Sequence, residues 1–234
     1  MDIELYNGDA KAIVSTNGGY LTNLANIRGD ILFPKRTLLA PDGDQKVRGG
    51  CHVCLPNFGP GGESGLAQHG FGRSSNWAVV ATTENTVELA QHGEGEYVDM
   101  ESILHYELQQ SSLKMALTLK NRGEHPLKVA PGFHPYFATG STLPIVNSVL
   151  EQDSSRYGVA QFLSGGMQYL TAGGRNLTLS STGLPNWAVW TDRVESYICV
   201  EPTENGNAFV DEDTQPRTLL PDQEAFYTMT IDWS

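Results

Sequence analysis

Three stretches of the sequence combine titratable side chains with glycine, proline and aromatic residues. The first runs from Val47 to Arg73, the second from Pro131 to Phe137 and the third from Trp187 to Pro202. Glycine and proline favour tight turns, and aromatic rings provide apolar walls around a polar group. A sugar ring fits such surroundings, because its C–H face packs on aromatic rings while its hydroxyl groups take hydrogen bonds.

The six histidines do not all lie in such surroundings. His69 and His134 are set among glycine, proline and aromatic residues, where an imidazole can transfer protons or hold a substrate. We interpret the other four as surface or hydrogen-bonded structural residues: His52, His92, His105 and His125.

The pair Cys51 and Cys54 lies close to two histidines and raises the question of a metal site. Structural zinc sites usually combine two such pairs, and the sequence has neither a second Cys-x-x-Cys nor a His-x₃₋₅-His. Residues three apart in an extended segment also face opposite sides. We therefore interpret these cysteines as small buried residues and expect no bound metal.

The segments that must position these residues show a hydrophobic pattern that repeats every two residues. Apolar and polar residues alternate over residues 104–108, 113–120 and 227–233. This spacing predicts antiparallel strands with one face in water, and Gln110-Ser111-Ser112 predicts a hairpin loop between the first two. No stripe of helical period covers three turns. We expect an all-β sandwich with little helix, as a single domain over residues 1–234.

The longest stretch without such a pattern runs from about Phe33 to Asn76 and is rich in glycine and proline. It contains His69 and Arg73. We predict that it is largely irregular, and a loop of this length inside a compact domain is more often functional than idle.

Composition and charge limit the partners. The 234 residues include 27 acidic and 15 basic side chains, which gives a formal net charge of −12. Nucleic acids and anionic lipids repel such a chain, so we expect neither as a partner. The sequence has no apolar run near the ~18 residues of a membrane helix and no secretory signal at its start. With only three cysteines, these features predict a cytoplasmic protein.

Five short motifs occur in the order and rough spacing of one known family. They are Arg48-Gly49-Gly50, Pro56-x-Phe58-Gly59, Gln68-His69-Gly70-Phe71-x-Arg73, His134-Pro135-Tyr136-Phe137 and Cys199-Val200-Glu201-Pro202. Together they resemble the aldose 1-epimerase (galactose mutarotase-like) superfamily, whose fold is a large antiparallel β-sandwich. The resemblance implies interconversion of the α and β anomers of a sugar without cofactor or metal. The chain departs from the pattern at Cys51-His52-Val53-Cys54, where family members often carry apolar residues.

The resemblance also implies a role for individual residues. Glu201 takes the position of the general base and His134 that of the general acid, on opposite sides of the anomeric carbon. His69 would hydrogen-bond the substrate near the ring and help to polarise the opening aldehyde, and Asp192 would grip hydroxyl groups. Because it follows Tyr197-Ile198-Cys199-Val200, we expect Glu201 at the end of a strand.

Two arginines bear on the identity of the sugar. A hexose 6-phosphate presents a dianion, which favours charged and bidentate donors such as Arg48 and Arg73. The motifs around these arginines look more like the glucose-6-phosphate 1-epimerase branch than the galactose branch. We therefore favour a sugar phosphate over a free aldose as the partner, and we expect a monomer or weak dimer.

Two other functions stay open at this point. A sandwich of this fold could bind sugars without turning them over, as a carbohydrate-binding module. A glycoside hydrolase could use Glu201 together with Asp192 or Asp211, because hydrolases place two carboxylates across the scissile bond. A structure in which Glu201 faces His134 instead of a second carboxylate would exclude the hydrolase.

Overall fold

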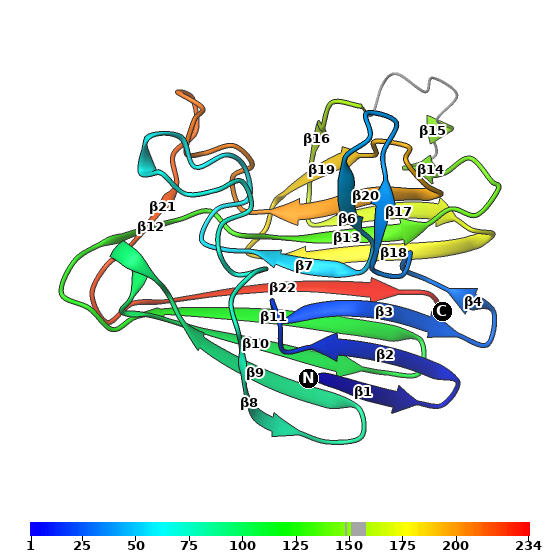
Figure 1. Cartoon of the computed structure of the whole chain (residues 1–234), viewed down its shortest axis with the longest axis horizontal. Helices are drawn as coiled ribbons and strands as arrows, with labels where there is room; N and C mark the ends of the chain where they lie inside the picture. Colours follow the sequence, from blue (N-terminus) through cyan, green and yellow to red (C-terminus); the bar gives the residue numbers. More distant parts are fainter. Residues whose placement is uncertain (148, 151–157) are drawn as a thin grey trace.

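The computed structural model describes residues 1–147, 149–150 and 158–234, and its described part is built from two nine-stranded antiparallel sheets (Figure 1). The first sheet has the spatial order β1 (Asp2–Asn7), β2 (Ala10–Ser15), β3 (Tyr20–Asn26), β7 (Cys51–Cys54), β13 (Gly132–Ala138), β20 (Tyr197–Thr203), β19 (Asn186–Trp190) and β16 (Gln161–Ser164), with β4 (Gly29–Asp30) paired to β3.

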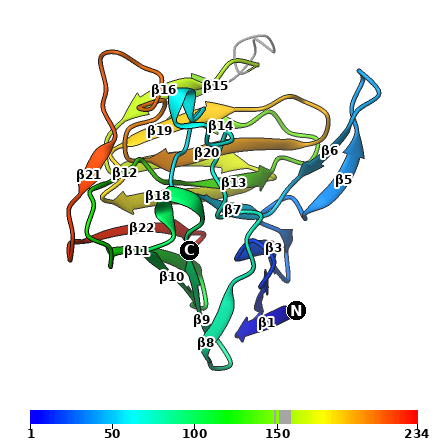
Figure 2. The same ribbon diagram turned by 60° about the vertical axis from the view of Figure 1, so that its left-hand side comes forward.

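The second sheet has the order β15 (Val149–Leu150), β14 (Ile145–Val146), β17 (Met167–Ala172), β18 (Arg175–Thr182), β22 (Glu224–Asp232), β11 (Ser112–Asn121), β10 (Met100–Leu108), β9 (Thr86–His92) and β8 (Ala78–Thr82). Two short ribbons complete the strands: β12 (Leu127–Val129) pairs with β21 (Arg217–Leu219), and β5 (Arg36–Leu39) pairs with β6 (Gln45–Arg48). Figure 2 shows both ribbons at the margins of the two sheets.

One hydrophobic core joins the two sheets. It combines Leu5 and Val14 of the first sheet with Leu104, Met115 and Met229 of the second, all fully buried. The alternation read from the sequence is confirmed on β10, where buried and half-buried residues alternate along the whole strand. The turn between β10 and β11 covers residues 109–111, one residue earlier than the predicted loop at 110–112. The fold is therefore the expected β-sandwich.

Helix is as scarce as predicted. The described residues contain two single 3₁₀ turns, at Gly62–Ser64 and Gly95–Tyr97. In these parts of the chain no helix is long and apolar enough to cross a membrane.

The prediction that residues 33–76 are irregular is wrong in part, because this stretch contains β5, β6 and β7. Strand β7 is buried on both faces, so its residues show no alternation of apolar and polar types. Strands β5 and β6 pair only with each other and contain no fully buried residue. Because neither strand packs a face against the core that joins the two sheets, their sequences show no alternation of apolar and polar residues.

Candidate active site

Three titratable side chains lie in one row across neighbouring strands of the first sheet. His52 on β7 pairs directly with His134 on β13. On the other side of β13, the register with β20 places His134 opposite Glu201. Residues directly opposite one another in antiparallel strands project from the same face. Strand pairing therefore brings together residues that are far apart in the sequence.

The alternation of these strands separates the row from the core. The neighbouring residues Val53, Phe133 and Val200 project from the opposite face and belong to the main core. Glu201 lies within β20, which continues to Thr203, and not at the end of a strand as expected. The pairing of β20 with β19 extends to Thr203 and keeps this part of the backbone extended.

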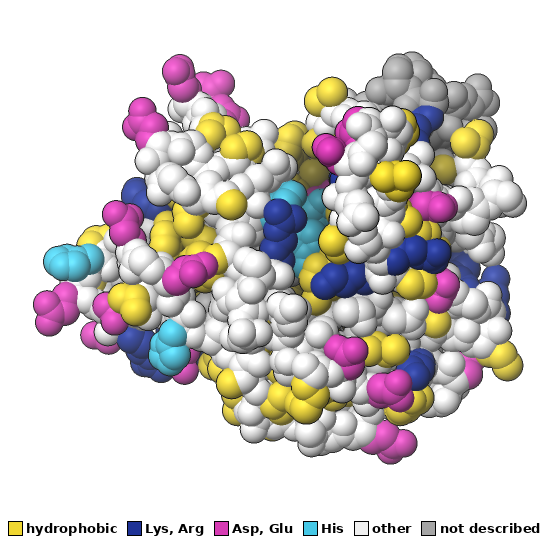
Figure 3. Space-filling model, in the orientation of Figure 1, with side chains coloured by type: hydrophobic (Ala, Val, Ile, Leu, Met, Phe, Trp, Pro, Cys, Tyr) yellow, Lys and Arg dark blue, Asp and Glu magenta, His cyan; other side chains and the backbone are white. Residues whose placement is uncertain are grey.

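Two members of the row, His134 and Glu201, line a pocket of about 510 Å³, and His52 lies outside its lining. Figure 3 shows histidine side chains at the base of a hollow with a basic side chain in front of them. The lining combines the predicted residues Arg48, His69, Arg73, His134 and Glu201 with aromatic rings that the sequence analysis had not assigned: Phe58, Tyr136, Phe162 and Trp190. The pocket thus combines one histidine–glutamate pair, two guanidinium groups and apolar walls.

His134 and Glu201 form the polar centre of this pocket. The Nε2 atom of His134 lies 3.4 Å from Oε2 of Glu201, and both side chains are almost fully buried. Burial lowers the pKa of His134 well below its ordinary 6.5 and raises the pKa of Glu201 well above 4.5, because each group loses hydration in its charged form. The pair therefore favours a net charge of zero, with one proton shared between two sites.

His69 reaches the same pocket from the loop after β7. Its backbone has a φ of +67°, in the left-handed region that non-glycine residues rarely adopt, and Gly70 follows at +62°. Its Nδ1 donates to the carbonyl of Phe58 at 2.6 Å. Burial lowers the pKa of His69 to about 4, so at neutral pH the ring is uncharged and Nε2 carries a lone pair. His69 accordingly offers the pocket an acceptor.

Asp192 lies behind Arg48 and is not part of the pocket lining. Its Oδ2 accepts from Nε of Arg48 at 2.8 Å, and its Oδ1 accepts from the hydroxyl of Tyr197 and the backbone N–H of Val194. Both carboxylate oxygens are thus occupied within the protein, which does not fit the expected grip on sugar hydroxyls. Asp192 instead fixes the direction of the Arg48 guanidinium, which also lies over the ring of Trp190.

Arg73 is held much less firmly. Its side chain is exposed and donates one hydrogen bond of 3.3 Å to the carbonyl of Gln68. The pocket therefore has one guanidinium group held by an ion pair, that of Arg48, and one with a single weak contact, that of Arg73.

Among the described residues that line the pocket, Glu201 is the one carboxylate. Asp192 is bound to Arg48, and Asp211 lines a different cavity. The pairing of Glu201 with His134 removes the basis for a two-carboxylate glycoside hydrolase.

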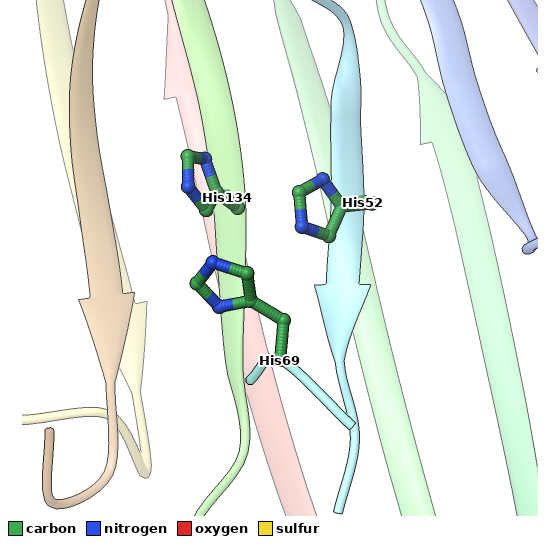
Figure 4. A group of neighbouring side chains, drawn as sticks. All are labelled: His52, His69 and His134. Carbon is green, nitrogen blue, oxygen red and sulfur yellow. The ribbon is translucent and has the colours of Figure 1, made fainter. Parts of the chain in front are cut away.

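His52 is the site residue whose position the sequence analysis missed. It is 2% exposed, and its ring centroid lies 4.7 Å from that of His134 and 5.6 Å from that of His69 (Figure 4). The sequence around it gives no local signal of this proximity, because the pairing of β7 with β13 creates it. By contrast His92 and His125 lie at exposed positions, and His105 is half-exposed.

The three cysteines are buried and unpaired, as interpreted from the sequence. Cys51 belongs to the main core and Cys54 lies on the side of the pocket, which confirms that they face opposite sides. Burial raises the pKa of all three thiols, so they stay protonated at neutral pH.

We predict that acid destabilises the protein through its buried histidines. In the unfolded chain His52 takes up a proton as the pH falls through about 6.5, whereas the folded chain keeps it neutral because its pKa is lowered. The unfolded state then binds more protons, so stability is lost as the pH falls below 6.5. His52→Gln should flatten this loss by about 1.4 kcal/mol per pH unit, the value of one proton. Urea unfolding between pH 7 and pH 5 measures both slopes, and parallel slopes for variant and parent would contradict the prediction.

Comparison with known proteins decides the family. The aldose 1-epimerase family profile matches residues 1–157, two thirds of the chain. The chain belongs to the aldose 1-epimerase family. The matched segment of this family member includes Arg48, His69, Arg73 and His134 and ends before Glu201.

Individual relatives agree with this assignment. Over 103 residues the chain is 30% identical to the Escherichia coli K12 protein named "Putative glucose-6-phosphate 1-epimerase", and the match covers 40% of this chain and 33% of that protein. The chain thus aligns with about a third of the length of that relative. A Salmonella typhimurium protein of the same name is 46% identical over 39 residues, 17% of this chain and 13% of its own length.

Solved structures support the fold of this aldose 1-epimerase family member over its whole length. A structure titled putative aldose 1-epimerase from Escherichia coli K12 has a TM-score of 0.79 at 17% identity, covering 100% of this chain and 99% of the other. A galactose mutarotase-like protein from Lactobacillus casei has a TM-score of 0.78 at 16% identity, covering 100% of both chains.

Proposed function

We propose that the chain is a mutarotase that interconverts the α and β anomers of a hexose 6-phosphate by acid–base ring opening and closure. The observation that carries this proposal is the His134–Glu201 pair, 3.4 Å apart at the centre of a pocket with arginine and aromatic lining. The family membership supports a mutarotase-type isomerase, and the site residues supply the chemistry.

One shared proton is sufficient for the reaction. In the reactive form His134 is protonated and Glu201 is ionised. Glu201 accepts the proton of the anomeric hydroxyl while His134 donates its proton to the ring oxygen, so the bond between the ring oxygen and C1 breaks and an open-chain aldehyde forms. After rotation about the bond between C1 and C2, the freed hydroxyl attacks the other face of C1. His134 takes back its proton, Glu201 returns the other, and the pair is restored.

The remaining groups hold the sugar. With Nδ1 engaged by Phe58, His69 accepts a hydrogen bond from a sugar hydroxyl near the ring, a role of orientation in place of the polarising role expected from the resemblance. The rings of Trp190 and Phe58 provide surfaces for the C–H face of the sugar. Burial of the pair strengthens the interactions that arise as charge moves during ring opening.

Arg48 and Arg73 support a phosphorylated substrate. Both line the same pocket as His134 and Glu201, in a chain whose net charge is −12. A phosphate dianion gains strongly from guanidinium donors, whereas a free sugar has no charge to pair with them.

The test is magnetisation exchange between the H1 signals of the α and β anomers in NMR spectra recorded at equilibrium. Spectra are recorded with glucose 6-phosphate and separately with glucose and galactose, each with and without protein. Faster exchange for glucose 6-phosphate alone supports the proposal. Faster exchange only for the free sugars assigns the chain to aldoses, and no acceleration for any sugar contradicts mutarotation and favours a binding module.

We predict that Asp192→Asn weakens the binding of the phosphorylated sugar and leaves the rate of ring opening unchanged. The amide keeps the shape of the side chain but removes the charge that fixes Arg48. We expect KM for glucose 6-phosphate to rise about fivefold, equivalent to about 1 kcal/mol for a partly exposed ion pair, with kcat unchanged. Exchange rates at several substrate concentrations measure both. A fall in kcat with unchanged KM would instead indicate that Asp192 acts on the reacting ring.

A further inference from the structure

Three histidines cluster at the pocket: His69 and His134 line it, and His52 lies beside them outside the lining. The proposed mutarotation uses only His69 and His134. His52 is almost fully buried beside His134, and its Nε2 atom has no hydrogen-bond partner. The Nδ1 atom of His134 is likewise buried without a partner. A buried polar atom left unpaired is costly, so such atoms call for an explanation.

The hydrogen bonds of His52 and His69 give both rings the same tautomer. The hydroxyl of Tyr20 donates to the carbonyl of Gly49, so it accepts from Nδ1 of His52 at 3.3 Å and leaves a lone pair on Nε2 of His52. His69 donates from Nδ1 to the carbonyl of Phe58 in the same way. In metal sites a ligating histidine usually donates its second nitrogen to such an oxygen, which fixes the ring and its tautomer.

The ligand atoms are close enough to hold a common ion. One nitrogen each of His52, His69 and His134 lies within 4.8 Å of the others. Figure 4 shows His52 and His134 projecting from adjacent strands and His69 reaching toward them from the loop. Zinc–nitrogen bonds of about 2.0–2.1 Å require shorter separations, so the rings of His52 and His134, which are stacked at an interplanar angle of 23°, must turn toward a common point when an ion binds.

We propose that His52, His69 and His134 form a binding site for one divalent transition-metal ion of the zinc class. Three neutral imidazoles favour Zn²⁺, Co²⁺, Ni²⁺ or Cu²⁺ over the oxygen-seeking Mg²⁺ and Ca²⁺. The hydrogen bonds at Nδ1 leave Nε2 of His52 and Nε2 of His69 each with a lone pair that an ion can accept. The spacing of Cys51 and Cys54 gave no reason to expect this site, because it uses the histidines and not the thiols.

A bound ion would inhibit mutarotation. The ion would either occupy the nitrogen of His134 that carries the proton or turn the His134 ring away from Glu201. In both cases His134 no longer delivers a proton to the ring oxygen of the sugar. This consequence rests on the proposed function, whereas the binding of the ion does not.

The binding test uses the full chain after treatment with a chelator. Co²⁺ is titrated while the visible absorption of its tetrahedral complex is followed, and Zn²⁺ is added to displace it. We expect one site per chain. His52→Gln, which leaves Glu201 and His134 in place, should weaken Co²⁺ binding by more than about 100-fold, and Tyr20→Phe should weaken it by about 10–100-fold, because it removes the oxygen that orients His52.

His105→Gln is the matched control, because His105 lies outside the pocket and is half-exposed. Far-UV circular dichroism and thermal unfolding establish that each variant is folded. Absence of a tetrahedral Co²⁺ spectrum with the parent, or equal affinities for the parent and His52→Gln, would overturn the site. If His52→Gln does not fold, the Tyr20→Phe result decides.

Measuring anomer exchange with and without Zn²⁺ distinguishes failure of the metal-site proposal from failure of the mutarotase proposal. Zn²⁺ should suppress anomer exchange of the parent and leave that of His52→Gln unchanged. If Co²⁺ binds but Zn²⁺ does not slow exchange, the inhibitory role is wrong. If Co²⁺ binds and no sugar exchanges even without metal, the mutarotase proposal fails while the metal site stands.

Discussion

Glu201→Gln is expected to lower the rate of anomer exchange by about 10²–10⁴, the usual contribution of one positioned acid or base. Glutamine keeps the shape of the side chain on β20 but cannot accept the proton of the anomeric hydroxyl. The effect should appear in kcat with little change in KM, because the sugar is held mainly by other groups. Exchange NMR with glucose 6-phosphate at saturating concentration measures it.

Several controls make this prediction specific to the pair. Glu212→Gln removes a carboxylate from an exposed position and should leave the rate unchanged. His134→Asn should have a loss similar to that of Glu201→Gln, and the double variant should lose little more than either, since the two groups act as a unit. A rate for Glu201→Gln within about threefold of the parent would remove Glu201 from the mechanism.

Arg73→Ala is expected to raise KM for glucose 6-phosphate by about 10–100-fold, the loss expected when a hydrogen bond to a charged group is removed. Arg73 is the more suitable of the two arginines for this test. Its side chain makes one weak contact, with the carbonyl of Gln68, so its removal disturbs little of the protein. Removal of Arg48 would also leave Asp192 without its partner.

The comparison between substrates interprets the Arg73 result. KM for glucose or galactose should stay near its parental value, and Arg122→Ala, which removes an exposed arginine paired with Glu101, should change neither substrate. Equal losses for free and phosphorylated sugars would indicate that Arg73 supports the loop that carries His69 and does not contact phosphate.

The sandwich could be predicted where a strand has one face in the core and one in water. Leu104, Tyr106 and Leu108 alternate with less buried residues because β10 has two different faces. The same reasoning fails on β7, where Cys51-His52-Val53-Cys54 is buried on both faces and no alternation is imposed.

The sequence could identify individual residues of the candidate site, but it could not predict which of them lie next to one another in space. Motif resemblance selected His134 and Glu201, yet their opposition depends on the register of β13 with β20, which no local spacing encodes. For the same reason His52 looked structural, since only the pairing of β7 with β13 brings it beside His134. The partners of Asp192 could not be predicted either, because its side chain is engaged by Tyr197 and by Arg48, which is distant in the sequence.

The row of His52, His134 and Glu201 across three neighbouring strands also has a consequence for how the chain acquires its activity. Each residue comes from a different part of the sequence, so the row forms only after long segments between the strands have been closed into loops. Pairings of this kind are slow to form compared with local hairpins such as β10–β11. In a refolding experiment, anomer exchange should therefore return after most of the β-sheet circular dichroism, and its time course would report the closure of the central strands.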